Sequence, residues 1–190
     1  MQQNRLNILV SPLDWGLGHA TRCIPVINEL LQAGHSVILA GEGRSLLLLQ
    51  KEFPSLKTLR FNGFSPSYPK SGYLLLHLAK QLPVFIAACF RDNSMLKKII
   101  ASHNIDVVIS DNRYGLRNKK VFSVLLTHQL MVKMPRGLKF AEYLVHRIIL
   151  FLIRFFDYCF VPDTAKAPGL SGDHSHKYKV PANVKFLGVL

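Results

Sequence analysis

The residues of this sequence that are best suited to chemistry lie close together near its N-terminus. Gly16 and Gly18 are followed by His19 and, three residues later, by Arg22. Glycine tolerates positive φ and lets a ligand approach the backbone closely, and an imidazole can accept a proton near neutral pH. An imidazole, a guanidinium and free backbone N–H groups together suit an acidic or hydroxyl-bearing ligand. The alternative is a tight turn that binds nothing.

The flanking sequence places these residues between a strand and a helix. Leu6–Val10 is an apolar run typical of a buried strand, and Ser11-Pro12 is expected to end it, because proline has no N–H to donate. Beyond residue 20 the apolar residues follow a helical spacing. Strand, glycine loop and helix form the opening unit of an open α/β sheet, whose helix N-terminus can bind an anion. The dinucleotide motif G-x-G-x-x-G would need glycine where Thr21 stands.

Strands and helices alternate along the rest of the chain. The predicted strands cover residues 36–40, 56–61, 106–110, 121–126, 158–161 and 183–190. Three further helices are predicted. One begins near residue 44, one covers 71–104 with a break or kink at Pro83, and one covers 138–156. Between residues 111 and 121 we expect only a turn, because the connection is short for a crossover helix. The alternation predicts an α/β fold with a Rossmann-like, mostly parallel sheet flanked by helices.

In such a sheet, ligands bind beyond the carboxyl ends of the strands. This rule brings the glycine loop to the same edge as Asp111, Asn112 and Arg113 and as His128, which follow two later strands. Each has a simpler explanation: Asp111 could cap a turn, Arg113 could be a solvated charge, and His128 could be a buried, hydrogen-bonded imidazole. Their convergence on one edge favours a ligand site. The predicted substrate-binding residues are Gly16, Gly18, Arg22, Asp111, Asn112, Arg113 and His128.

Composition narrows the class of protein. A length of 190 residues suits one domain, and a hydrophobic content of 49% indicates a globular chain. The three cysteines are far apart and are predicted to be buried thiols of a reducing compartment. The N-terminal apolar run is too short for a signal peptide, so we expect a cytoplasmic protein. His174 and His176 have no third candidate ligand nearby, and we expect no metal.

The net charge of +13, from 24 basic and 11 acidic residues, favours acidic partners. No RNA-binding aromatic motif, zinc-finger spacing or obvious helix-turn-helix is found, which argues against nucleic acid. Basic residues instead flank the apolar segment 138–156, whose longest apolar run, Ile148–Ile153, is far shorter than the ~20 residues that span a bilayer. Its helix could be part of the core, a partner interface, or an in-plane membrane helix. The last interpretation predicts that residues 133–156, including Arg136, bind an anionic surface such as the inner face of the plasma membrane.

The run from Gly16 to Pro25, GLGHATRCIP, resembles the start of GT-B glycosyltransferases. It is most similar to the bacterial peptidoglycan GlcNAc-transferase group, which is glycosyltransferase family 28-like. In that group a glycine-rich loop ending in Gly-His joins the first strand to the first helix of the N-terminal, acceptor-binding domain. The family loop carries more glycines, and here Asp14 and Trp15 stand where small residues are expected.

The resemblance implies that residues 1–190 are the N-terminal, acceptor-side half of a GT-B enzyme. A C-terminal domain absent from this chain would hold most of the nucleotide-sugar donor, so the chain alone is expected to be inactive. The apolar run 184–190 at its end agrees with this expectation. The acceptor would be a hydroxyl, with lipid-linked acceptors among the candidates, and no cofactor is expected.

His19 is expected to activate or position that acceptor, unless it merely caps the first helix. Two rival functions remain open beside the glycosyltransferase. One is a sugar-nucleotide epimerase of similar architecture, which a product assay would distinguish. The other is a non-catalytic Rossmann-like module that binds a nucleotide or serves as a membrane adaptor.

Overall fold

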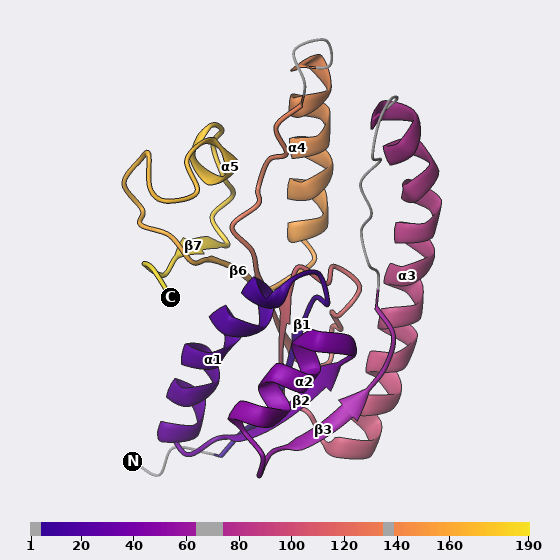
Figure 1. Ribbon diagram of the computed structural model, residues 1–190, viewed down its shortest axis with the longest axis vertical. Coiled ribbons are helices and arrows are strands. Elements are labelled where there is room, and N and C mark those ends of the chain that lie inside the picture. The colour runs from indigo at the N-terminus through magenta and orange to yellow at the C-terminus, as the bar shows by residue number, and fades with distance from the viewer. Residues whose placement is uncertain (1–4, 64–73, 135–138) are drawn as a thin grey trace.

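The computed structural model, which describes residues 5–63, 74–134 and 139–190, contains a seven-stranded parallel sheet with helices on both faces (Figure 1). Its strands are β1 (Asn7–Pro12), β2 (Ser36–Gly41), β3 (Lys57–Arg60), β4 (Val107–Asp111), β5 (Phe122–Leu126), β6 (Tyr158–Val161) and β7 (Val184–Phe186). They lie in the order β3-β2-β1-β4-β5-β6-β7. The predicted Rossmann-like α/β fold is confirmed, with every neighbouring pair parallel.

The described helices are α1 (Leu17–Gln32), α2 (Gly43–Glu52), α3 (Leu74–His103), α4 (Lys139–Ile153) and the short α5 (Asp173–His176). The helix predicted from residue 71 is described only from residue 74. Within it Pro83 does not end α3, so the predicted break is wrong. A proline removes a single backbone hydrogen bond, and the later turns of α3 are held to the sheet by Leu96 and Ile99.

β1 extends to Pro12, two residues further than predicted. Its pairing with β2 ends at Val10 and Leu39. On the other side, the hydrogen bond beyond Pro12 comes from the Leu13 N–H to the Asp111 carbonyl oxygen, at 3.0 Å. Proline therefore occupies the last position of a central strand, which is one of the few positions where a sheet tolerates it.

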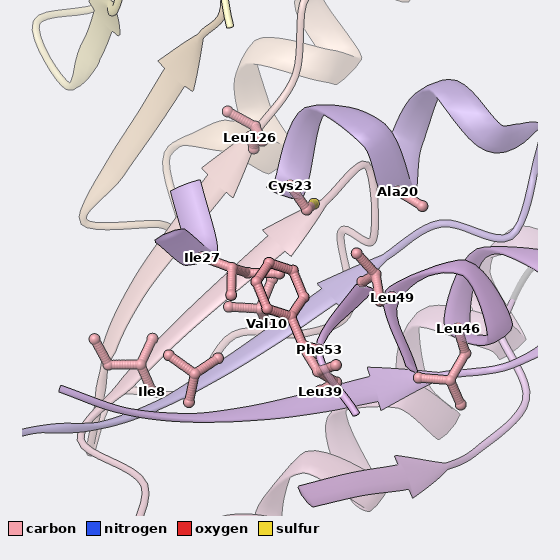
Figure 2. Close-up of a cluster of buried hydrophobic side chains, with 11 residues drawn as sticks. Ile8, Val10, Ala20, Cys23, Ile27, Leu39, Leu46, Leu49, Phe53 and Leu126 are labelled. Atoms are coloured by element: carbon pink, nitrogen blue, oxygen red, sulfur yellow. The ribbon is translucent and has the colours of Figure 1, made fainter. Parts of the chain in front are cut away.

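The alternation of side chains along the central strands builds a core on each face of the sheet. Figure 2 shows Ile8 and Val10 of β1 packed with residues of α1 and α2, among them Ile27 and Leu49. The intervening residue, Leu9, faces α3 on the opposite side of the sheet. Successive strand residues point to opposite faces, so an unbroken apolar run such as Ile8–Val10 must be covered on both.

A third cluster lies beneath β5, β6 and β7 and includes Cys159. All three cysteines are free, as the sequence predicts, with Cys23 and Cys159 buried and Cys89 half-buried. Burial raises the pKa of Cys159 to about 12 and that of Cys89 to about 11. These thiols are therefore poor nucleophiles at neutral pH.

The orientation of α4 differs from the one expected for a core helix. Its polar residues Glu142 and His146 are buried. Glu142 accepts a hydrogen bond from the Met134 N–H at 2.9 Å and another from Lys177, and these two contacts lower its pKa. Five large apolar or aromatic residues are left exposed beside Lys139 and Arg147: Phe140, Tyr143, Leu144, Ile148 and Phe151. From the hydrophobic pattern alone, these apolar residues would be expected inside. Instead, the polar face with Glu142 and His146 packs inward, because both side chains find hydrogen-bond partners there.

Figure 1 shows α3 and α4 as the two helices that extend furthest beyond the sheet. Across the described residues, no helix combines the length and the apolar character that crossing a bilayer requires. Arg136, one of the basic residues expected to contact a membrane, lies outside the described residues.

Candidate functional site

Four of the predicted site residues meet at the carboxyl edge of the sheet. Asp111 is the last residue of β4 and pairs in register with Pro12, the last residue of β1. His19 and Arg22 stand in the first two turns of α1, which follows β1 after a short loop. His128 follows β5, the next strand beyond β4. The order of the strands therefore brings together residues 92 and 106 positions apart in the chain.

The Asp111 carboxylate is the centre of this group. The Nδ1 atom of His19 lies 2.9 Å from Asp111 Oδ1. Arg22 donates to both carboxylate oxygens, through Nε and Nη2. The same guanidinium contacts His128 Nδ1 through Nη1 and His19 Nδ1 through Nη2. Arg22 thus links all four side chains.

The burial of these groups decides their electrostatics. The Asp111 side chain is fully buried, whereas 9% of the His19 side chain and 12% of the Arg22 side chain are exposed. A buried carboxylate is stable only when a cation and hydrogen bonds compensate its lost hydration, and Arg22 supplies both. Burial and the Arg22 charge lower the pKa of His128, so this imidazole is held neutral. Within the His19–Asp111 pair, only the imidazole is in reach of an incoming ligand.

The two glycines of the loop have different roles. Gly16 precedes α1 with φ of +82°, a conformation that favours glycine. Gly18 lies inside the first turn of α1 and does not use the positive φ that glycine allows. A Cβ atom added at Gly18 would meet no other atom within 4 Å, and the space next to it is open.

The start of α1 has no side-chain cap. His19 directs its Nδ1 to Asp111 rather than to a backbone N–H of the first turn. The alternative interpretation, in which His19 only caps the helix, is therefore wrong. The uncapped N–H groups of α1 remain available to an anion or an acceptor oxygen.

Arg113 does not join the group, although the sequence places it only two residues after Asp111. Its guanidinium is buried and forms a two-point ion pair with Asp92 of α3, with distances of 2.7 and 3.2 Å. It also donates to Ser11 Oγ at 3.3 Å and lies over the Phe61 ring. With these contacts Arg113 holds α3 against the strand ends, and it is not placed to bind substrate. Asp92 carries no local sequence signal, because only the fold makes it a partner.

Asn112 and two residues of the first loop complete the surroundings. Asn112 has φ of +53° and donates its backbone N–H to the Leu126 carbonyl at 3.1 Å, which fixes the turn after β4. Asp14 Oδ1 accepts the Ser45 N–H at 3.0 Å and so caps α2, a role that the sequence did not suggest. The Trp15 ring lies beside His19, with centroids 6.4 Å apart.

Neither histidine of α5 contributes to this site. His174 Nδ1 lies 3.0 Å from the Met131 carbonyl oxygen, and His176 Nε2 lies 3.3 Å from Asp163 Oδ2. Over the described part of the chain, no group of three or more His, Cys, Asp or Glu side chains could hold a metal ion. The two histidines therefore tie α5 to its neighbours.

Compared by sequence, the chain matches no protein-family model and no curated protein. Compared by structure, it resembles UGT2 of Phytolacca americana, solved with UDP-2fluoro-glucose and pterostilbene, with a TM-score of 0.60 at 13% identity over 98% of this chain and 54% of that one. A glycosyltransferase from Rickettsia africae matches with a TM-score of 0.54 at 14% identity, and the match covers 98% of this chain and 43% of that one. A putative UDP-N-acetylglucosamine 2-epimerase from Listeria monocytogenes matches with a TM-score of 0.52 at 11% identity, and the match covers 95% of this chain and 44% of that one.

At such identities these similarities show the fold alone. The sheet and its flanking helices are those of a GT-B glycosyltransferase domain, a fold that an epimerase shares. The chain spans about half the length of these structures. The narrower similarity to the peptidoglycan GlcNAc-transferase group stays a prediction.

Proposed function

We propose that this chain is the acceptor-side half of a GT-B glycosyltransferase, which transfers a sugar from a nucleotide-sugar donor to a hydroxyl acceptor. The observation that carries the proposal is the His19–Asp111 pair at the carboxyl edge of the sheet, 2.9 Å apart and accompanied by Arg22. In an open α/β sheet, this edge is where ligands bind.

The pair can act as a general base. In the tautomer that carries its proton on Nδ1, His19 donates to Asp111 Oδ1, and the lone pair of Nε2 is free to take the proton of the acceptor hydroxyl. The acceptor oxygen then forms a bond to the anomeric carbon, and the bond from that carbon to the donor's phosphate oxygen breaks. Asp111 stabilises the imidazolium that results, as a carboxylate does beside other catalytic histidines. Arg22 holds the Asp111 carboxylate in place through two contacts, so we assign it a positioning role.

The loop before α1 offers a place for the groups that meet this base. The N–H groups of the first turn of α1 are uncapped, and the space beside Gly18 is open. A helix N-terminus favours negative charge, so a donor phosphate or a polar acceptor group suits this position. Most contacts to the nucleotide would come from a second α/β domain, as the coverage of about half of each structural neighbour suggests.

The exposed apolar face of α4 favours a second property, peripheral attachment to a membrane. Phe140, Leu144 and Phe151 are 75%, 61% and 56% exposed, and the basic residues Lys139 and Arg147 are exposed on the same helix. An apolar face with flanking basic residues is typical of helices that lie in the plane of an anionic bilayer. Such attachment would suit a lipid-linked acceptor.

A product assay tests the proposed function. A form of the enzyme that includes a donor-side domain is incubated with a panel of nucleotide sugars and hydroxyl acceptors, and the products are identified by mass spectrometry. A glycosylated acceptor is the expected product. An epimerised nucleotide sugar would instead establish the epimerase, and ligand binding without any product would establish the non-catalytic module. The 190-residue chain alone is expected to show no transfer, and robust transfer by it would contradict the assignment as a half enzyme.

A further inference from the structure

A cavity lies at the opposite edge of the sheet from His19. Its volume is about 920 Å³, and its wall includes Val121, directly before β5, and Asp157, directly before β6. Lys97 and Ile100 from the last turns of α3 form another part of the wall, and the segment after α4 completes it. Because it lies at the amino ends of the strands, this cavity is separate from the His19–Asp111 site.

The cavity carries a concentrated positive charge. Five cationic side chains line it, against one carboxylate, that of Asp157. Asp157 Oδ2 already accepts the Ser123 N–H at 2.7 Å. Within the part of the chain that the structure describes, none of the five cations forms an ion pair with an acid. The five residues are Lys97, Arg117, Lys119, Lys120 and Arg154.

Arg117 is the least exposed of these cations. Its guanidinium lies over the Phe155 ring, 4.1 Å from the centroid. Its backbone carbonyl accepts the side-chain amide of Asn93 at 2.6 Å, which ties this segment to α3. Its buried Nε has no hydrogen-bond partner among the described residues, and burial lowers the pKa of the guanidinium. A buried donor without an acceptor is unfavourable, and the charge of this guanidinium has no paired acid among the described residues. An anion in the cavity would compensate that charge.

We infer that this cavity binds a phosphate group, carried either by a soluble phosphorylated molecule or by a lipid headgroup. Arg117 supplies a planar guanidinium suited to two-point contact with phosphate oxygens, and its stacking on Phe155 holds that plane in place. Lys119, Lys120 and Arg154 add exposed charges around it. Several cations in one concave site match a multiply charged anion better than a single carboxylate. The volume leaves room for the group that bears the phosphate.

Two triple variants of the 190-residue chain test this site. Lys119→Gln/Lys120→Gln/Arg154→Gln removes three exposed charges from the cavity, and Arg44→Gln/Lys51→Gln/Lys57→Gln removes three exposed charges from α2 and β3. Calorimetric titration with pyrophosphate, and sedimentation with vesicles of phosphatidic acid in phosphatidylcholine, measure the two sources of phosphate. The cavity variant is expected to raise the Kd at least tenfold, and the control less than threefold. Equal melting temperatures show that both variants fold.

The two sources of phosphate give different results. Saturable binding of pyrophosphate that the cavity variant loses supports a soluble ligand. Binding to phosphatidic-acid vesicles alone, lost in the same variant, supports a lipid headgroup. Binding to neither probe would overturn the inference, and so would an equal loss in both triple variants. Arg117→Lys keeps the charge but removes the planar fork, and it is expected to weaken binding of the effective probe several-fold.

Discussion

Arg22 is the residue on which the other side chains of the carboxyl-edge site converge. It contacts Asp111, His19 and His128 at once, and its own side chain is 12% exposed. Its guanidinium forms an ion pair with the buried Asp111 carboxylate. The sequence suggested an anion-binding role for Arg22. Its contacts make it the group that organises the general base.

Replacing His19 separates a catalytic role from a structural one. In a complete enzyme, His19→Ala is expected to lower turnover by roughly 10²–10⁴, because the imidazole paired with Asp111 is lost as the base. Its melting temperature should change little, since Asp111 keeps both of its contacts with Arg22. Melting and turnover are measured on one preparation.

A matched control is His103→Ala, at the far end of α3, which should leave turnover unchanged. A His19 variant that melts early but turns over normally would end the catalytic assignment. If His19→Ala loses both turnover and the folded state, His19→Gln is measured instead, because it keeps a polar side chain of similar size without a titratable ring.

His128 makes the stability of the chain depend on pH. Its pKa is lowered in the folded protein by burial and by the Arg22 charge, so below about pH 6.5 the unfolded chain binds this proton more readily. The free energy of unfolding should therefore decrease as the pH falls through that value. His128→Gln is expected to give a shallower decrease in melting temperature between pH 7 and pH 5. His103→Gln should keep the slope of the native chain, and an unchanged slope in His128→Gln would contradict the expectation.

Among the elements, α3 is positioned by one close approach to the loop after β4. A Cβ atom added at Gly115 would lie 2.4 Å from the Cys89 carbonyl oxygen and 2.7 Å from the Cβ of Asp92. Gly115→Ala should therefore push α3 away from the strand ends and lower stability by about 1–3 kcal/mol. Denaturant unfolding measures the change.

Gly18→Ala provides the control, because it adds the same methyl group in open space inside a helix. It is expected to leave stability unchanged or to raise it by about 0.5–1 kcal/mol. Equal stability of the two variants would show that α3 has no fixed distance from the loop. In the complete enzyme, Gly18→Ala also tests whether a ligand uses the open space beside His19.

The elements also show what a sequence can predict. The buried strands are short apolar runs between turn residues, and all seven are predicted to within a few residues. The partners of the site follow from the rule for parallel sheets, which brings Asp111 and His128 to His19. Arg113 was misplaced because a guanidinium after a strand can turn either to the ligand or to α3. The choice depends on Asp92, 21 residues away and buried by tertiary packing.

Which face of α4 is buried could not be predicted for a similar reason. Hydrophobic periodicity identifies two faces of a helix but assumes that the apolar one is buried. Here the Met134 N–H and Lys177 donate to Glu142, and the Leu130 carbonyl oxygen accepts from His146 Nδ1. A polar face satisfied in this way can pack inward, which leaves the apolar face outside.

For the molecule as a whole, this exposed face predicts attachment to anionic membranes. The chain should sediment with vesicles that contain anionic lipid and less so as salt rises, because each nearby basic residue contributes about 1 kcal/mol that salt screens. Phe140→Ser/Leu144→Ser removes two exposed apolar side chains of α4 and should weaken binding more than tenfold.

The control is Leu47→Ser/Leu170→Ser, which removes two apolar side chains of 56% and 77% exposure from other parts of the surface. It should leave vesicle binding unchanged. Equal binding to neutral and anionic vesicles, or no binding to either, would exclude the electrostatic attachment. Both variants leave the cationic cavity at the amino edge intact, so its contribution is measured separately.

The strand order also has a consequence for synthesis on the ribosome. β1 is made first, but it lies in the interior of the sheet, between β2 and β4. Its edge toward β4 stays unpaired until residue 111 has left the exit tunnel, and an open apolar edge readily pairs with other chains. A nascent chain stalled within α3 is therefore expected to need a chaperone at this edge. The His19–Asp111 pair forms only when that edge is closed.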